Sequence, residues 1–388
     1  MTKLEVLNPA TNEVIETLEY TDEATMNKQI EKAHDAFLSW REVDAHTRSE
    51  KLWAWSKLID EHKEELAELI TKEGGKPLKE ALGEVDYARS YVDWYAEEAK
   101  RLYGRTIPAN SASKKIIVQS FPVGVVGAIT PWNFPAAMIT RKMAPALAAG
   151  CTIVCKPAVQ TPLTTIRLVE LAHEAGIPKG AIQYVIISGK DAGRISTESP
   201  IIQKITFTGS TPVGKKLIEG AASSVKNVTM ELGGLAPVIV HKDANIDDAV
   251  DQTIATKFRN AGQTCICANR IYVHEDIVDT YVDKLIQKVH ELKVGNGLDK
   301  GVDVGPLINQ DGVDKVVHQI KDAEAKGGQL SRSLDEIESL GGNFLKPVVI
   351  SNANQDMEIM HKETFGPVAP VMAYADLDDA IKMANDTE

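Results

Sequence analysis

The sequence predicts an α/β protein with a doubly wound parallel sheet. Strand-like and helix-like segments alternate from Val125 to Leu232, which is typical of parallel strands joined by helices. The run Val125–Ile129 is apolar enough to be a strand buried on both faces. A second α/β stretch follows Gly233-Gly234, where we place a domain boundary. Ligands of such sheets bind beyond the carboxyl ends of the strands, so we expect the functional residues there.

Composition excludes several classes of protein. The chain has 388 residues, of which 43% are hydrophobic and 25% charged, and its formal net charge is −12. The negative charge disfavours generic binding to nucleic acid or to an anionic membrane. No run of about 18 apolar residues is present, and the N-terminus lacks the apolar core of a signal peptide. Four cysteines do not form a disulfide framework in a chain this long, so we expect a cytoplasmic location. We also expect no metal site.

The first hundred residues are predicted to be mostly helical and to carry no chemistry. Residues 1–20 alternate weakly around Asn8-Pro9, which indicates a hairpin or edge strands. Helical periodicity then predicts three helices, over Ala24–Trp40, Thr47–Lys72 and Leu78–Leu102.

The central segment supplies the predicted sheet. Two strands separated by Pro122 are expected between residues 115 and 130. Further strands are expected at Thr152–Lys156, Ile182–Ile187, Lys204–Thr208 and Asn227–Glu231, with helices at Ala137–Ala149, Pro162–Ala175 and Val213–Ala222. Beyond Gly234 we expect helices at Ile246–Ala261, Glu275–Lys293, 312–326 and Asp379–Asn385, and strands at Arg270–His274, Leu345–Ile350 and Val368–Tyr374.

Two motifs follow the first strands of this sheet. Asn133 lies between prolines in Pro131-Trp132-Asn133-Phe134-Pro135, and an amide fixed there can donate to a developing oxyanion. The alternative is a structural turn asparagine. Lys156 ends the next strand, where it can reach a ribose or phosphate, or it is a solvated lysine at a strand end.

Two more motifs follow later strands. The segment Phe207–Gly214 ends a strand and opens a helix, and its Gly209 and Ser210 suit the approach of a phosphate. It is not G-x-G-x-x-G, so alone it indicates a dinucleotide only weakly. Glu231 precedes two glycines and is a candidate general base, or a surface glutamate at a turn. All four motifs end strands of one predicted sheet, so we expect them at one crevice.

The run from Arg259 to Arg270 holds two of the four cysteines. Small and polar residues lead into Cys265, which suits a tight loop that presents a thiol to a cleft. A buried structural cysteine is the alternative.

Together these motifs resemble the aldehyde dehydrogenase superfamily over essentially the whole chain. The resemblance rests on Pro131–Pro135, Lys156-Pro157-Ala158, Phe207–Gly214, Glu231–Gly234, Gly262–Cys265 and Glu363–Pro367, which occur in the order and spacing of the family. Within the family, Cys265–Arg270 with Arg141 and Arg259 resembles the succinate-semialdehyde dehydrogenases.

The resemblance implies an aldehyde-dehydrogenase-like fold. Residues 1–103 and 123–233 would form the dinucleotide-binding domain, residues 104–122 an oligomerisation strand, and residues 234–388 the catalytic domain. The family continues beyond residue 388, so the catalytic domain is expected to be C-terminally incomplete. The complete protein is expected to be a homodimer or homotetramer.

The resemblance also implies a mechanism. The Cys265 thiolate attacks an aldehyde, Asn133 holds the oxyanion, hydride passes to NAD or NADP, and Glu231 activates the water that hydrolyses the thioester. Arg141 and Arg259 would bind the carboxylate of succinate semialdehyde. The residues expected to contact the coenzyme are Trp132, Lys156, Gly209, Ser210, Gly214, Glu363 and Phe365.

Several alternatives remain open from the sequence. The substrate can be another aldehyde, such as glutarate semialdehyde or a neutral aliphatic one, and the chain can be a catalytically silent structural member. Arg141 and Arg259 can instead be surface arginines paired with carboxylates. Val159 stands where the family often has a ribose-binding glutamate, so we expect NADP to be tolerated. Cys267 is expected to form a strained, reducible disulfide with Cys265, or it only fills space.

Overall fold

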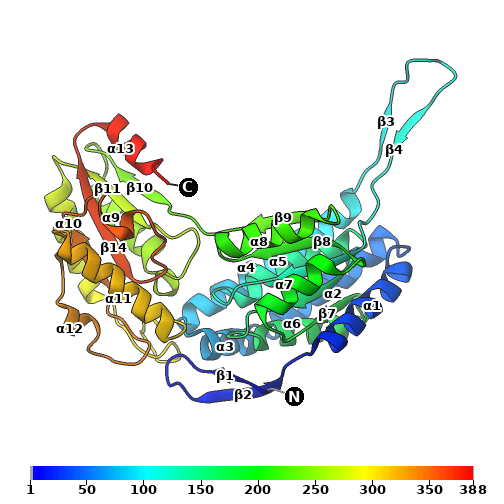
Figure 1. Ribbon diagram of the computed structural model, residues 1–388, viewed down its shortest axis with the longest axis horizontal. Helices are drawn as coiled ribbons and strands as arrows, with labels where there is room; N and C mark the ends of the chain where they lie inside the picture. Colours follow the sequence, from blue (N-terminus) through cyan, green and yellow to red (C-terminus); the bar gives the residue numbers. More distant parts are fainter. Residues whose placement is uncertain (1–2, 388) are drawn as a thin grey trace. The chain divides into compact units, whose positions relative to one another are not determined.

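The computed structural model describes residues 3–387, which divide into two compact units (Figure 1). Unit 1 contains Glu16–Ile70 and Ala81–Leu232, together with the start of the first strand. Unit 2 contains Leu7–Ile15, Thr71–Glu80 and the chain from Gly233 onward. Two short segments from the first hundred residues therefore pack with unit 2, which the sequence did not indicate.

A five-stranded sheet forms the centre of unit 1. Its strand order is β7-β6-β5-β8-β9, and every neighbouring pair is parallel. The order runs outward from β5 in both directions, which is the doubly wound arrangement that the sequence predicts. The strands are β5 (Val125–Ile129), β6 (Thr152–Lys156), β7 (Ile182–Tyr184), β8 (Ile202–Thr208) and β9 (Asn227–Glu231).

Helices cover both faces of this sheet (Figure 1). One face packs against α1 (Glu23–Trp40), α7 (Gly189–Glu198) and α8 (Thr211–Ala222). The other packs against α5 (Pro135–Ala148) and α6 (Leu163–Glu174), with α2 (Ala45–Glu61) packed on α5 and α6. Helices α3 (Lys63–Gly74) and α4 (Leu78–Glu98) follow α2, and α4 continues into a 3-10 turn, Ala99–Arg101.

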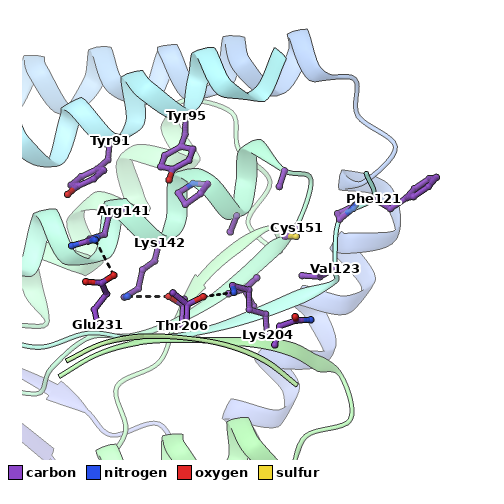
Figure 2. Close-up of a pocket in the computed structure, with 17 residues that line it drawn as sticks. Tyr91, Tyr95, Phe121, Val123, Arg141, Lys142, Cys151, Lys204, Thr206 and Glu231 are labelled. Carbon is purple, nitrogen blue, oxygen red and sulfur yellow. Dashed lines mark hydrogen bonds and ion pairs between the residues drawn. The ribbon is translucent and has the colours of Figure 1, made fainter. Parts of the chain in front are cut away.

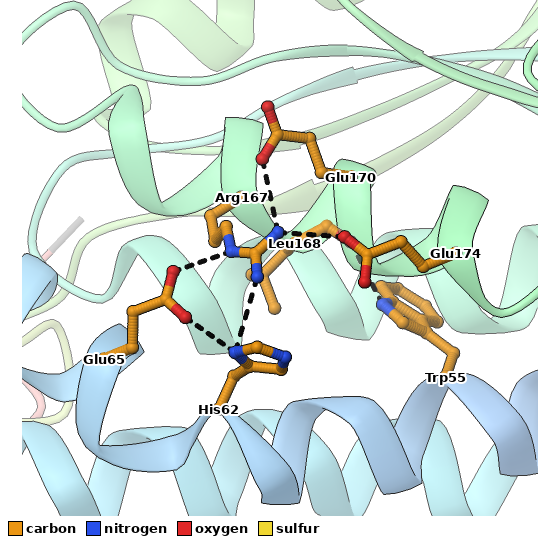
Figure 3. Close-up of polar contacts among 7 residues, drawn as sticks. All are labelled: Trp55, His62, Glu65, Arg167, Leu168, Glu170 and Glu174. Carbon is orange, nitrogen blue, oxygen red and sulfur yellow. Dashed lines mark hydrogen bonds and ion pairs between the residues drawn. The ribbon is translucent and has the colours of Figure 1, made fainter.

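The long helix expected over Thr47–Lys72 is broken at His62, which separates α2 from α3. Figure 3 shows the junction docked on α6. Arg167 of α6 donates to the Glu65 carboxylate at 2.7 Å and approaches His62 Nδ1 at 3.4 Å. Trp55 also donates to the Leu168 carbonyl at 3.0 Å. These contacts hold the two helices separately against α6, and the periodicity of the sequence does not report them.

Two small strand pairs complete this part of the chain. Strands β1 (Lys3–Leu7) and β2 (Val14–Glu19) pair as expected for residues 1–20. Strands β3 (Arg105–Ile107) and β4 (Ile116–Val118) form a hairpin that projects from unit 1 (Figure 1). Every residue of β3 and β4 is exposed.

Unit 2 has its own five-stranded sheet with the order β10-β11-β14-β13-β12. The first four strands are parallel and β12 is antiparallel to β13. The strands are β10 (Pro237–Val240), β11 (Arg270–His274), β12 (Gln329–Leu330), β13 (Val348–Ser351) and β14 (Val368–Tyr374). The helices are α9 (Ile246–Lys257), α10 (Val278–Glu291), α11 (Gln310–Ala325), α12 (Leu334–Ile337) and α13 (Leu377–Ala384). No helix within residues 3–387 is long and apolar enough to span a bilayer.

Candidate functional site

The four motifs of unit 1 follow strands of one parallel sheet, as predicted. Asn133 follows β5, Lys156 ends β6, Gly209 follows β8 and Glu231 ends β9. The backbone N–H of Gly209 donates to the Glu231 carbonyl at 3.0 Å, which ties the ends of β8 and β9 together. The motifs therefore lie along the carboxyl edge, where ligands of such sheets bind.

Asn133 is buried and stands just before α5, whose first residue is Pro135. The start of α5 is capped from a distance, because Glu84 Oε1 of α4 accepts from the N–H groups of Ala136 at 2.9 Å and Ala137 at 3.3 Å. Glu84 is fully buried. A carboxylate at a helix N-terminus is favourable, and here it fixes the turn that carries Asn133. The sequence around Glu84 gives no sign of this contact, because Glu84 looks like an ordinary helical glutamate.

Glu231 and Arg141 lie side by side in a cavity of about 520 Å³ on unit 1 (Figure 2). Arg141 Nη2 is 3.6 Å from Glu231 Oε1, and its guanidinium carbon lies 5.5 Å from the centre of the Tyr91 ring. Burial, followed by the hydrogen bond between the Tyr91 and Tyr87 hydroxyls, raises the pKa of Tyr91 to about 12. The expected base and one expected substrate-binding arginine are therefore neighbours, a pairing that the sequence did not indicate.

A buried lysine lies next to this pair. Lys142 Nζ donates to Thr206 Oγ1 at 3.2 Å (Figure 2). Burial and then the neighbouring Arg141 lower the pKa of Lys142 to about 8, while Glu231 opposes this change. The available sequence signal was a lysine beside an arginine in a helix that is otherwise mostly apolar.

The end of β8 and the start of α8 form a cradle of donors. Ser210 is the N-cap of α8, but its side chain makes no capping hydrogen bond, so its hydroxyl is available to a ligand. The first N–H groups of a helix attract a phosphate. Gly214 is buried on the first turn of α8. Lys156 is buried as well, and burial lowers the pKa of its ammonium to about 8. These groups fit the phosphates and riboses of a dinucleotide.

The motif Pro131–Pro135 and its neighbours also adjoin this edge. Trp132 is half-buried, and its carbonyl accepts from Thr161 Oγ1 at 3.2 Å. Val159 is half-buried beyond the end of β6.

The loop that carries Cys265 in unit 2 is strained. Asn260, Ala261 and Gly262 have consecutive φ values of 51°, 54° and 74°, in the left-handed region. Residues other than glycine rarely adopt the left-handed conformation, which costs on the order of 1–3 kcal/mol for each such residue. At Gly262 no side chain fits, because a Cβ atom would lie 2.1 Å from the Gly366 carbonyl oxygen. The tight loop expected from the sequence is confirmed, and its backbone strain is typical of functional sites.

Hydrogen bonds compensate for this strain. The Asn260 N–H donates to Glu80 Oε2 at 2.8 Å, and Gln263 Nε2 donates to the Asn260 carbonyl at 3.0 Å. Gln263 Oε1 accepts from the Ile308 N–H at 2.9 Å. The loop is thereby attached, within unit 2, to Glu80 and to the segment before α11, which keeps Cys265 in place.

The two cysteines of the loop have different surroundings. Cys265 is partly exposed and lines a cavity of about 630 Å³ on unit 2. Cys267 is buried, and its thiol donates to the Lys257 carbonyl at 3.4 Å. No disulfide joins the two cysteines in this structure.

Glu363 and Phe365 form a second strained motif of unit 2. Phe365 has a φ of 55°. Glu363 is half-buried, and its Oε1 has no hydrogen-bond partner among residues 3–387. Burial raises the pKa of Glu363, while Lys315, the Gly234 N–H and Lys257 oppose this rise. A buried acceptor without a partner is costly unless a donor arrives, so this oxygen fits a hydroxyl group of a ligand.

The arginines near the loop differ in accessibility. Arg259 is exposed on unit 2, whereas Arg141 belongs to unit 1. Arg270 is fully buried, and it donates to the carbonyls of Leu235 at 2.6 Å and Ala384 at 2.8 Å. It therefore attaches the end of α13 to the segment that precedes β10.

Comparison with known proteins identifies the family. The family model described as the aldehyde dehydrogenase family matches residues 1–388. The chain belongs to the aldehyde dehydrogenase family.

Relatives of the chain within the aldehyde dehydrogenase family include proteins named as semialdehyde dehydrogenases. A mitochondrial succinate-semialdehyde dehydrogenase of Oryza sativa subsp. japonica is 50% identical over 99% of this chain and 73% of its own length. A glutarate-semialdehyde dehydrogenase of Pseudomonas putida is 48% identical over 99% of this chain and 80% of its own. A crystal structure of an NADP-dependent enzyme from Escherichia coli is 46% identical, with a TM-score of 0.98, over 100% of this chain and 80% of that one. The aldehyde dehydrogenase fold predicted from the motifs is thereby confirmed.

No cluster of three or more metal-ligating side chains occurs in the part of the chain that the structure describes.

Proposed function

We propose that this aldehyde dehydrogenase oxidises a short aldehyde that carries a carboxylate, namely succinate semialdehyde to succinate. The observation that supports this substrate is Arg141, a partly exposed guanidinium that lines the cavity beside Glu231. A guanidinium binds a carboxylate through two parallel hydrogen bonds. The succinate-semialdehyde dehydrogenase that is 50% identical to the chain supports the same substrate.

Three residues perform the chemistry in this proposal. The Cys265 thiolate attacks the aldehyde carbon to form a thiohemiacetal, whose oxyanion accepts a hydrogen bond from the Asn133 amide. When bound, NAD or NADP accepts the hydride. The Cys265 thioester is then hydrolysed by water that loses a proton to the Glu231 carboxylate. The strained loop around Cys265 and its hydrogen bonds support a thiol held in a fixed position.

The coenzyme is NAD or NADP. Its phosphates fit the start of α8 at Gly209, Ser210 and Gly214, and Lys156 supplies a cation at the end of β6. Glu363 accepts from a ribose hydroxyl, and Trp132 and Phe365 contact the coenzyme by likeness to the family. Val159 has no charge that would repel a 2′-phosphate, and the Escherichia coli relative is described as NADP-dependent, so we expect NADP to be accepted.

Arg141 and Arg259 are proposed to bind the substrate carboxylate. Glutarate semialdehyde is the second candidate substrate, because a glutarate-semialdehyde dehydrogenase is 48% identical to the chain. Both aldehydes end in a carboxylate, and they differ by one methylene group.

Assembly and regulation complete the proposal. The hairpin of β3 and β4 exposes Ile107 and Ile117, which supports its role as an oligomerisation element of a homodimer or homotetramer. We place the enzyme in the cytoplasm. Cys267 forms a reversible disulfide with Cys265 under oxidising conditions.

Arg141→Ala tests the substrate. Arg141 is partly exposed, so we expect the lower end of the range for a buried charge contact, about 2 kcal/mol or roughly 30-fold in kcat/KM for succinate semialdehyde. The kcat/KM for butanal, which has no carboxylate, should change little. Arg194→Ala removes an exposed arginine paired with Glu23 and Glu198, and it serves as the matched control. Equal losses for both aldehydes would show that Arg141 is structural.

A further inference from the structure

The side chain of Asn269 joins three segments of unit 2. Its Nδ2 donates to the carbonyl of Gly234 at 3.3 Å and to that of Cys267 at 3.2 Å. Its Oδ1 accepts from the N–H of Thr364 at 3.3 Å. The side chain is only 1% exposed. Because all three partners are backbone groups, this one carboxamide fixes the path of the chain in all three segments.

The contact with Thr364 ties Asn269 to the segment that carries Glu363. The Gly234 carbonyl also accepts from Asn269. Asn269 in turn accepts from Thr364, the residue after Glu363. A Cβ atom on Gly233 would lie 2.7 Å from Glu363 Oε2, so the carboxylate rests directly on the glycine backbone. Asn269 therefore contacts both segments that adjoin the Glu363 carboxylate, at Gly234 and at Thr364.

The same carboxamide holds the loop of Cys265. The carbonyl of Cys267, which Asn269 contacts, lies two residues after Cys265. The Cys267 N–H donates to the carbonyl of Thr264 at 3.0 Å. Cys265 thus lies within a turn from Thr264 to Cys267, and the Cys267 end of this turn is hydrogen-bonded to Asn269.

We propose that Asn269 is a positioning residue that couples the occupancy of Glu363 to the reactivity of the Cys265 thiol. The inference rests on the proposed function, in which Glu363 contacts the coenzyme and Cys265 is the nucleophile. A hydroxyl that donates to Glu363 Oε1 shifts the segment Glu363-Thr364, and the Asn269 carboxamide transmits this change to the turn around Cys265. A carboxamide supplies the acceptor and the two donors that these three contacts need, and no other neutral side chain of this size does so.

The test measures alkylation of Cys265 with and without ADP-ribose. The unpaired Glu363 Oε1 is an acceptor, and the donors of the coenzyme are chiefly its ribose hydroxyls. ADP-ribose and its 2′-phosphate keep these hydroxyls and lack the nicotinamide ring, so they do not shield the thiol. Iodoacetamide labelling is followed by mass spectrometry of the Cys265 peptide, and calorimetric titration establishes saturation.

Saturation with ADP-ribose should change the alkylation rate of the parent by about fivefold or more, and that of Asn269→Leu by less than about twofold. Leucine keeps the approximate volume and removes all three hydrogen bonds, and Asn269→Ser provides a second variant with a different packing cost. Asn343→Ser is the matched control. Asn343 is a buried asparagine of unit 2 that donates to the Pro9 carbonyl at 2.9 Å, and its variant should keep the parental ratio.

The coupling and the proposed function fail in different ways. Asn269 variants that bind ADP-ribose and keep the parental ratio overturn the coupling. An alkylation rate of the parent protein that does not change when ADP-ribose binds also overturns the coupling. In that case the proposed function still stands if turnover requires Cys265. A Cys265→Ser variant with parental turnover overturns both.

Discussion

Replacing Lys156 by methionine should stabilise unit 1 and weaken coenzyme binding. Lys156 ends β6 with 7% of its surface exposed, and burial lowers the pKa of its ammonium from 10.5 to about 8. Each pH unit of that difference corresponds to about 1.36 kcal/mol, so the charged form costs the folded state about 3 kcal/mol at pH 7. Lys156→Met removes this cost and keeps an apolar side chain. We expect the free energy of unfolding to rise by about 2–3 kcal/mol.

The gain must depend on pH in a defined direction. Because the folded-state pKa of Lys156 lies below its unfolded-state value, the cost is present in full below about pH 8. It fades as the pH rises from 8 toward 10.5, where the unfolded chain also loses the proton. The advantage of Lys156→Met should therefore be largest at pH 7 and small near pH 10.

The five tryptophans provide a suitable probe for this measurement. They are Trp40, Trp53, Trp55, Trp94 and Trp132, and all belong to unit 1. Urea unfolding followed by tryptophan fluorescence at pH 7 and pH 10 therefore reports on the unit that contains Lys156. Lys190→Met, at an exposed lysine of α7, is the matched control and should change little. A variant no more stable than the parent at pH 7, or a gain that does not change with pH, would refute the reasoning.

Two further substitutions probe unit 2. Burial raises the pKa of Glu363, so its carboxylate costs stability at neutral pH, and that cost is relieved as the pH falls through the raised value. Glu363→Gln should therefore slow hydrogen exchange in unit 2 at pH 7, with a smaller effect at acidic pH. The KM for the coenzyme should rise. An unchanged KM would show that Glu363 does not bind the coenzyme. For Cys267→Ala, peroxide should inactivate the enzyme without recovery by a dithiol, whereas the parent should recover, and equal recovery would exclude the disulfide with Cys265.

The parallel sheet of unit 1 was predictable because strand-like and helix-like segments alternate along the chain and because β5 is a continuous apolar run. Strands β6, β9, β11 and β14 have the bounds that the sequence gives. Helix α7 was not expected, because its sequence, Gly189–Glu198, has two glycines and few apolar residues. It forms because Ser188 caps its N-terminus by accepting from the Asp191 N–H at 3.1 Å, and because it packs between α1 and α8.

Within the candidate site, only residues whose type and local sequence indicate a chemical role could be predicted. Cys265 and Glu231 stand out as a thiol in a loop of small residues and a carboxylate at a strand end. The pairing of Glu231 with Arg141 joins residues ninety positions apart, and no local pattern records it. The same holds for Glu84, whose partners at the start of α5 lie 52 and 53 residues later. Contacts of this kind depend on packing between helices and strands, which periodicity does not specify.

The roles of Cys265 and Glu231 are tested most directly by trapping the acyl-enzyme. Glu231→Gln, mixed with succinate semialdehyde and NADP, should release about one reduced coenzyme per site and then stall, since deacylation lacks its base. Peptide mass spectrometry of the quenched protein should then find a succinyl group on Cys265. The Cys265→Ser variant should give neither the burst nor the adduct. Full steady-state turnover by Glu231→Gln, or a succinyl group on any residue other than Cys265, would contradict the mechanism.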